Sequence, residues 1–314
     1  MLEKNLYFVL WILFLFSCRK QESVLFYKYQ SNVEDELTSI HFTDEKNGIA
    51  VGGNTWKRGI KLSTSDGGNH WSRDSLYDKQ LFALCKSSTP QEFFAAGIDQ
   101  RLYQFSIQHS QISKFGDYAF YRGMTALKQN KIILVGGESF GTGYIHQLDP
   151  HTLAFSNLLS LPRELDVIVS FDSLRMIVAG WGILLSSEDG GQSWDSTFLH
   201  EHWRDLHTFD QESAVAVGIN GSIIMTRDSG KNWAHLRKGN SIFVTDLPLR
   251  CIAFKNHLEG IAAGENGIVI KTRDGGKTWL ELEDLPEINY LDIFIQGSSY
   301  WLCGSEGVII RIEE

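Results

Sequence analysis

The stretch TRDGGKTW, Thr272–Trp279, places an aspartate, two glycines and a tryptophan within one short turn-like segment. Three similar stretches precede it: TSDGGNHW ending at Trp71, SEDGGQSW ending at Trp194 and TRDSGKNW ending at Trp233. Each has an Asp (Asp66, Asp189, Asp228 or Asp274), then a Gly two residues later and a Trp five residues later; we call them the Asp turns. In such a turn the carboxylate accepts backbone N–H bonds and Gly supplies positive φ. We expect the Trp, Trp279 in the last turn, to fold back and seal one repeat against its neighbour.

A second marker extends the repeat to parts of the chain that lack an Asp turn. Short apolar runs ending in glycine recur at Gly53, Gly97, Gly136, Gly180, Gly218, Gly264 and Gly304, with steps of 44, 39, 44, 38, 46 and 40 residues. Seven copies at this period, each read as short antiparallel strands separated by turns, indicate a β-propeller with four strands per blade.

The chain ends suggest how such a ring closes. The last unit, Ile288–Glu314, has three recognisable strands, and Ser23–Gln30 is a lone β-like segment before the first unit. Placing that segment at the edge of the last unit would remove an exposed sheet edge. The expected fold is therefore all-β: a seven-bladed β-propeller over residues 38–314, closed by a strand from the tether at 18–37.

The N-terminus resembles a secretory signal with a bacterial lipobox. Residues Leu6–Phe16 form an apolar run behind Lys4, too short to span a bilayer, and it leads into LFSC, Leu15–Cys18. We expect residues 1–17 to be a signal peptide and Cys18 to be lipidated, which anchors an exported protein in the cell envelope. An uncleaved or differently cleaved signal is the alternative, because Glu3 offsets Lys4.

Composition narrows the classes of function. The net charge of -9 disfavours nucleic-acid binding, which needs a basic face. Cys85, Cys251 and Cys303 have no CxxC spacing and lie in apolar runs, so we expect small buried side chains. We expect no cofactor and no metal; His200 and His202 share one face of an extended segment, but no spacing fixes a third ligand.

Arginines recur where the innermost strands begin. Aligning those strands by their apolar residues places at one level of the channel mouth Thr38, Gln80, Arg122, Arg163, Arg204, Arg250 and Leu291. An arc of four guanidinium groups suits a carboxylate, phosphate or sulfate. Trp56, Lys57 and Arg58, in a long turn between second and third strands, extend this basic mouth. The alternative is local pairing, with Glu164 and Asp205 as neighbours.

The four turns resemble the Asp-box, or BNR repeat, of sialidases, some glucan hydrolases and sortilin-type receptors. Together with turns such as GINGSII and GENGIVI, they make residues 38–314 most similar to the photosystem II stability/assembly factor-like propellers. The resemblance implies a binding scaffold for the assembly of membrane complexes, with an arginine-rich patch, and Asp-boxes placed away from the ligand.

The function expected is thus a non-enzymatic, membrane-tethered binding or assembly scaffold, monomeric, whose Arg-lined face binds an anionic segment of an envelope protein or an anionic ligand. A sialidase-like glycan hydrolase stays open, since Asp166, Asp205, Glu164 and Asp292 lie near the channel and such hydrolases need two carboxylates. A polysaccharide-binding propeller, using Trp56, Trp181 and Trp203, also stays open.

Overall fold

The structure is a computed structural model that describes residues 21–77, 79–87, 92–105, 110–115, 119–127, 131–138, 141–239 and 248–313. The expected signal peptide and Cys18 lie outside these residues, and they stay predictions. Within the described ranges, no helix is both long enough and apolar enough to cross a membrane.

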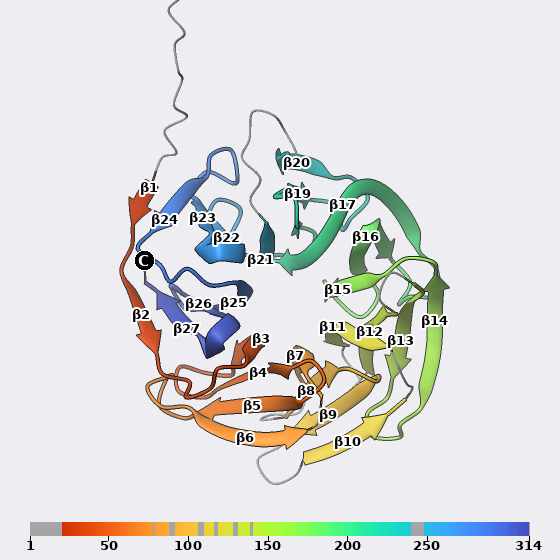
Figure 1. The fold of residues 1–314 in the computed structure, drawn as a ribbon. Helices are drawn as coiled ribbons and strands as arrows, with labels where there is room; N and C mark the ends of the chain where they lie inside the picture. The colour runs from red at the N-terminus through yellow and green to blue at the C-terminus, as the bar shows by residue number, and fades with distance from the viewer. Residues whose placement is uncertain are drawn as a thin grey trace, which may run out of the picture.

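The described chain is built of short strands arranged as a ring around a central axis (Figure 1). Three sheets come first in the sequence: β3 (Glu36–Phe42), β4 (Gly48–Asn54), β5 (Arg58–Thr64) and β6 (Ser72–Tyr77); β7 (Leu81–Lys86), β8 (Phe93–Gly97), β9 (Arg101–Phe105) and β10 (Ser110–Lys114); β11 (Phe120–Leu127), β12 (Lys131–Gly137), β13 (Gly143–Leu148) and β14 (Phe155–Leu161). In each, consecutive strands pair antiparallel and the first lies nearest the channel.

Three further sheets complete the ring. They are β15 (Leu165–Ser170), β16 (Met176–Ser187), β17 (Asp195–Thr208), β18 (Ala214–Gly218), β19 (Ile223–Thr226) and β20 (Ala234–Arg237); β21 (Leu249–Phe254), β22 (Gly260–Gly264), β23 (Val269–Thr272) and β24 (Leu280–Glu283) with β1 (Gln21–Ser23) at its edge; and β25 (Tyr290–Gln296), β26 (Ser299–Gly304) and β27 (Ile309–Ile312) with β2 (Phe26–Tyr29) at its edge. Two 3₁₀ turns, η1 (Glu265–Gly267) and η2 (Ser305–Gly307), join second to third strands.

The described strands form six sheets, so the prediction of seven separate blades is wrong as a count of sheets. The reason lies in β17, which pairs with β16 through Asp195–His202 and with β18 through Trp203–Thr208. One continuous strand thus serves as the outer strand of one sequence unit and the innermost strand of the next. The six-stranded sheet β15–β20 therefore contains two of the units that the glycine spacing predicts.

The segment Ser23–Gln30 supplies a strand to the last sheet, as expected. Residues Phe26–Tyr29 of β2 pair antiparallel with Ile309–Ile312 of β27. The chain thereby brings its first described strands beside its last ones (Figure 1). That this pairing is what holds the ring closed stays a prediction.

Every innermost strand carries a β-bulge near the channel. The residues bulged out of the ladder are Thr38, Phe82, Arg122, Asp166, Arg204, Arg250 and Leu291. A bulge re-aims its side chain, so these positions share one level of the channel.

The repeated glycine has a steric cause at this bulge. A Cβ on Gly52, Gly97, Gly136, Gly180, Gly264 or Gly304 would come within 1.8–2.3 Å of the carbonyl oxygen two residues before the bulge residue. At Gly218 the atom in the way is the Glu201 Cγ, at 2.0 Å. In the first unit this glycine is Gly52, paired with Leu37, and the sequence marker Gly53 is one residue off.

The Asp turns have the predicted geometry. In each, Asp Oδ1 accepts the backbone N–H four residues later at 2.9 Å, as Asp274 does from Thr278. The hydroxyl two residues before the Asp donates to the same carboxylate and accepts the N–H of the glycine two residues after the Asp, as Thr272 does for Gly276. That glycine has φ between +85° and +95° in all four turns.

The tryptophans of these turns seal neighbouring units, as expected. Trp71 packs with Phe42 and Trp301 of the first and last sheets, and Trp279 joins residues of β18 and β22. Trp194 and Trp233 pack in equivalent clusters, and each indole N–H donates at 3.1 Å to the carbonyl of the glycine two residues after the Asp of its turn. Cys251 and Cys303 are fully buried and Cys85 is half-buried; none of the three forms a disulfide.

Candidate functional site

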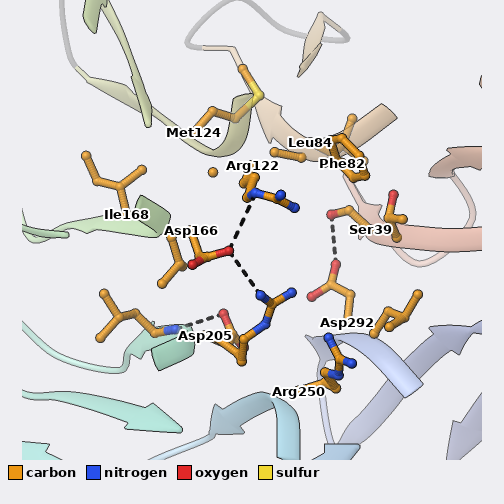
Figure 2. A pocket seen from close by; sticks show the side chains of 17 residues that line it. Ser39, Phe82, Leu84, Arg122, Met124, Asp166, Ile168, Asp205, Arg250 and Asp292 are labelled. Atoms are coloured by element: carbon orange, nitrogen blue, oxygen red, sulfur yellow. Dashed lines mark hydrogen bonds and ion pairs between the residues drawn. The ribbon is translucent and has the colours of Figure 1, made fainter. Parts of the chain in front are cut away.

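The central channel opens into a cavity of about 260 Å³ lined by the bulges. Thr38, Arg122, Arg204, Arg250 and Leu291 line it, as the sequence alignment predicted. Figure 2 shows Arg122 and Arg250 pointing into the opening from opposite sides, with Asp166, Asp205 and Asp292 between them.

Two of the aligned positions are wrong. In the second unit the bulge residue is Phe82, and Gln80 instead is buried, donating to Glu36 Oε2 at 3.1 Å. In the fourth unit the bulge residue is Asp166, and Arg163 lines a neighbouring cavity. The predicted arc of four arginines is therefore three arginines interrupted by a carboxylate.

Asp166 joins the two arginines on either side of it. Its Oδ1 lies 3.1 Å from Arg204 Nη1 and 3.7 Å from Arg122 Nε, and its Oδ2 lies 2.7 Å from His202 Nε2. Burial would raise the pKa of Asp166, but the His202 hydrogen bond and the two cations outweigh it and hold the pKa below its usual value. The carboxylate is thus ionised and orients both guanidinium groups.

The arginines have further carboxylate partners. Arg122 Nη2 lies 2.7 Å from Glu164 Oε1, and Arg250 Nε donates to Glu265 Oε1 at 2.9 Å. Local pairing, the alternative to a free cationic arc, is therefore present, with Glu164 bonded to Arg122 across the boundary between two sheets. Burial lowers the pKa of Arg204, and nearby Arg250 and Arg122 add to that shift while Asp166 opposes it.

Two channel carboxyls fasten neighbouring strands. Asp205 accepts the backbone N–H of Leu206 and of Ile252, both at 2.8 Å. Asp292 accepts the Ile40 N–H and the Ser39 hydroxyl at 2.8 Å, an interaction visible in Figure 2. Burial in the channel wall, with Asp292 nearby, raises the pKa of Asp205 to about 8, and burial raises that of Asp292 too.

Aromatic side chains line one side of the mouth. The Arg122 guanidinium lies 5.6 Å from the Phe82 ring centroid and 5.0 Å from that of Phe120. Trp56, 57% exposed, contacts Phe120 edge-on at 6.3 Å, and the Lys79 ammonium lies 5.0 Å from the Trp56 ring. These contacts place Trp56 beside the site, as predicted.

The other two predicted residues of the segment that joins β4 to β5 are Lys57 and Arg58. Arg58 turns away to Asp35, with Arg58 Nη2 2.8 Å from Asp35 Oδ2, so it does not extend the basic mouth. Lys57 is exposed, and within the described residues its side chain has no carboxylate partner. Trp203, one of the tryptophans of the glycan-binding alternative, is fully buried and is excluded from that role.

A second cavity, of about 520 Å³, adjoins the first. Its lining includes Arg163, the exposed Trp181 and Phe198, and the buried Glu201. His202 also lines it, and its ring nitrogen reaches Asp166 of the channel, so the two cavities share a wall. His200 is exposed on the same rim, and no group of three metal-ligating side chains occurs in the described ranges.

Sequence reasoning did not name Phe82, it placed Asp166 near the channel without assigning it to the bulge level, and it considered His202 only as a metal ligand. The signal for the first two was present in the glycine spacing, because each bulge is paired beside a marker glycine. His202 had no such signal: its role depends on a carboxylate 36 residues earlier.

The comparisons with known proteins place the fold. No protein-family model matches the chain, and no curated protein matches it either. Similar solved structures include YCF48 bound to D1 peptide (TM-score 0.74, 15% identity, covering 94% of this chain and 99% of that chain) and YCF48 from Cyanidioschyzon merolae (0.70, 16%, 92% and 98%). The RRP9 WD40 repeats are also similar (0.71, 9%, 94% and 98%). Identities this low show the β-propeller fold alone.

Proposed function

We propose that this protein is a non-enzymatic binding or assembly scaffold whose channel mouth holds an extended acidic segment of a partner protein. The observation that carries the proposal is the set of bulges, which fixes Arg122, Arg204 and Arg250 around one opening. Rigid propellers commonly serve as platforms for partners, and one structural neighbour, YCF48, is seen with a bound peptide.

The three channel arginines and their carboxylate partners offer a ligand hydrogen-bond donors in fixed positions rather than a large net charge. Glu164, Asp166 and Glu265 offset the three arginines, so the channel attracts no anion from a distance by its net charge. Each guanidinium has five N–H donors, and the carboxylates hold these groups in place before a ligand arrives. Arg204 Nε is buried and has no partner within the described residues. Fixed donors of this kind suit backbone carbonyls and carboxylate side chains.

Cations around the mouth supply the preference for an acidic segment. Lys57, Lys79 and Arg163 have no carboxylate partner in the described part of the chain. Lys57 lies in the turn between β4 and β5, and Trp181, whose carbonyl oxygen accepts a hydrogen bond from Arg163, lies in β16 directly after Gly180, which pairs beside the Asp166 bulge. An acidic segment lying across the mouth would pair with these cations.

The test is an affinity pull-down from envelope extracts with the wild type and with Arg122, Arg204 and Arg250 changed to Ala. The matched control is Arg273→Ala, since Arg273 pairs with Glu22 at the outer edge. Loss of the same partner only in the channel variant supports the proposal, provided that the variant melts as a folded protein. A partner retained by a folded channel variant overturns it.

A glycan hydrolase is the second candidate, favoured by the raised pKa of Asp205 beside Asp292, since a protonated carboxyl next to a second one is the catalytic pair of these enzymes. Against it, both carboxyls are used to accept backbone N–H bonds. Turnover of a fluorogenic sialoside or glucan, abolished by Asp205→Asn, would establish the hydrolase instead.

We also propose, from the sequence alone, that the protein is exported and anchored through a lipid on Cys18. Metabolic labelling with a palmitate analogue tests this proposal. Label should enter the wild type and not Cys18→Ser, and label in both or neither would refute it.

A further inference from the structure

We propose that the cavity between Trp181 and Phe198 is an anchor site, which takes a bulky apolar side chain flanked by a carboxylate from the same partner segment. This inference rests on the proposed function and names what the segment must contain. The anchor site is defined by Arg163, Trp181, Phe198, Glu201, His202 and Asn220.

The walls of the anchor site are large exposed aromatic rings. Trp181 is 49% exposed and Phe198 is 62% exposed, although both belong to paired strands. Trp181 rests on His202, with ring centroids 4.8 Å apart. Two such rings beside a cavity of about 520 Å³ suit an apolar side chain, and buried aromatic contacts commonly dominate binding energy at interfaces.

A cation lies at the rim. Arg163 Nη1 donates to the Trp181 carbonyl oxygen at 3.4 Å, and its guanidinium carbon lies 5.3 Å from the Phe198 ring centroid. Within the described ranges Arg163 has no carboxylate partner, although the channel arginines all have one. A guanidinium held over an aromatic ring and lacking a counter-ion can pair with a carboxylate of the ligand.

A buried acceptor lies in the wall. Glu201 is only 7% exposed, and its Oε1 accepts from the His202 N–H at 2.9 Å and from the Asn220 N–H and Nδ2 at 3.2 and 3.0 Å. Its Oε2 accepts no hydrogen bond from the described residues, and it is not one of the fully buried polar atoms that lack a partner. Oε2 can therefore accept a hydrogen bond at the cavity surface, and a ligand that brings an N–H group would supply it.

Continuity with the channel identifies the occupant. His202 contacts Trp181 on one side and Asp166 on the other, so a segment lying across the arginines passes the anchor site. An apolar residue of that segment would supply the side chain for the aromatic rings, its own N–H for Glu201 and a neighbouring carboxylate for Arg163. A neutral glycan would leave Arg163 without a counter-ion.

The probe is N-acetyl-phenylalanyl-aspartate amide, titrated into full-length protein labelled with 5-fluorotryptophan. The Trp181 fluorine signal is identified by its loss in Trp181→Phe, and that of Trp56 serves as the reference. The dipeptide should shift the Trp181 signal and not the Trp56 signal. Replacing its Phe by Ala should weaken binding roughly tenfold, the effect of a largely buried aromatic ring.

Variants separate the parts of the anchor site. Arg163→Ala should remove the preference for Asp over Asn in the dipeptide and keep the preference for Phe over Ala, whereas Arg273→Ala should change neither. An equal affinity for the Phe and Ala dipeptides overturns the proposal. So does a Trp181 shift produced by maltopentaose and not by the dipeptide, which would indicate a glycan site.

The outcomes also separate this inference from the proposed function. Failure of the anchor site appears as a dipeptide affinity that Arg163→Ala does not change. Failure of the proposed function appears as an acidic-peptide affinity that Arg250→Ala does not change, since Arg250 lines the channel and not the anchor site.

Discussion

Trp301 lies at the seam where the first and last sheets meet, so replacing it by Ala tests how the ring is held closed. Its side chain is fully buried, with ring centroids 4.4 Å from Phe42 of β3 and 5.0 Å from Tyr29 of β2. Its indole N–H donates to Gln296 Oε1 at 2.9 Å. A Cβ on Gly68 would come 2.6 Å from the indole, which shows how closely the first Asp turn covers it.

The size of the effect follows from this burial. Deleting a fully buried Trp side chain costs about 3–5 kcal/mol through lost apolar contact and the cavity left behind. For a domain of this size, each kcal/mol lowers Tm by about 2–4 °C, so we expect a fall of roughly 6–20 °C. The equally buried Trp203→Ala, in β17 and away from the seam, should cost a similar amount.

Hydrogen exchange followed by mass spectrometry distinguishes the two variants. In Trp301→Ala, exchange should accelerate in β2, β3 and β25–β27, because these strands pack on that indole. In Trp203→Ala, it should accelerate in β16–β18. If Trp301→Ala left exchange in β2 and β27 at the wild-type rate, the seam would not depend on this side chain, and the reasoning about closure would be wrong.

Three further predictions concern the bulge, the ion pairs and the Asp turns. Gly264→Ala should lower the free energy of unfolding in urea by about 1–3 kcal/mol, because its Cβ would lie 1.9 Å from the Pro248 carbonyl oxygen, and its extended backbone (φ −169°) adds no positive-φ strain. Gly297→Ala, at φ +58° with no atom within 4 Å, measures the positive-φ cost without a clash, and a Gly264→Ala loss no larger than that cost would contradict the steric argument. Asp166→Asn should lower the free energy of unfolding by about 3–5 kcal/mol, because Arg122 and Arg204 lose a buried counter-ion. A decrease below about 1 kcal/mol would show that the two ion pairs of Asp166 do not stabilise the fold together. Backbone and Thr278 hydrogen bonds lower the pKa of Asp274 to about 2, so its stabilisation is present above about pH 4 and is lost as pH falls to about 2. The Tm difference between wild type and Asp274→Asn should shrink over that range, and a difference independent of pH would refute it.

The repeat was predictable because steric rules impose it at fixed positions. The Asp turns require a carboxylate, glycines with positive φ and a sealing Trp, and these residues recur at constant spacing. The glycines opposite the bulges, all but Gly218, are just as constrained by the inner-strand carbonyl. β17 is long enough to merge two units into one sheet, and this length depends on its pairing with β16 between Asp195–His202 and Trp181–Ser186. The amino-acid composition gives no signal that the strand continues from one unit into the next.

The site was predicted less well because apolar alignment is a weaker guide to register than the glycines. Aligning by apolar residues chose Gln80 and Arg163, whereas the bulges step by 44, 40, 44, 38, 46 and 41 residues, close to the glycine steps. The glycine steps point instead to Phe82 and Asp166. Partners such as Glu164 for Arg122 depend on contacts between sheets, which no local pattern encodes.

The central claim is that a protein of net charge -9 binds an acidic segment at its channel mouth, and fluorescence polarisation measures this directly. The probe is a fluorescein-labelled peptide of alternating glutamate and serine. The channel variant carries Arg122→Gln, Glu164→Gln and Arg250→Ala. Arg122 and Glu164 are changed together so that neither side chain keeps a charge without its partner. Arg273→Ala is the control. We predict binding to the wild type that weakens as salt rises and weakens roughly tenfold or more in the channel variant, the loss expected for charged hydrogen bonds. Absence of binding, or equal affinity in the channel variant and the control, would contradict the account.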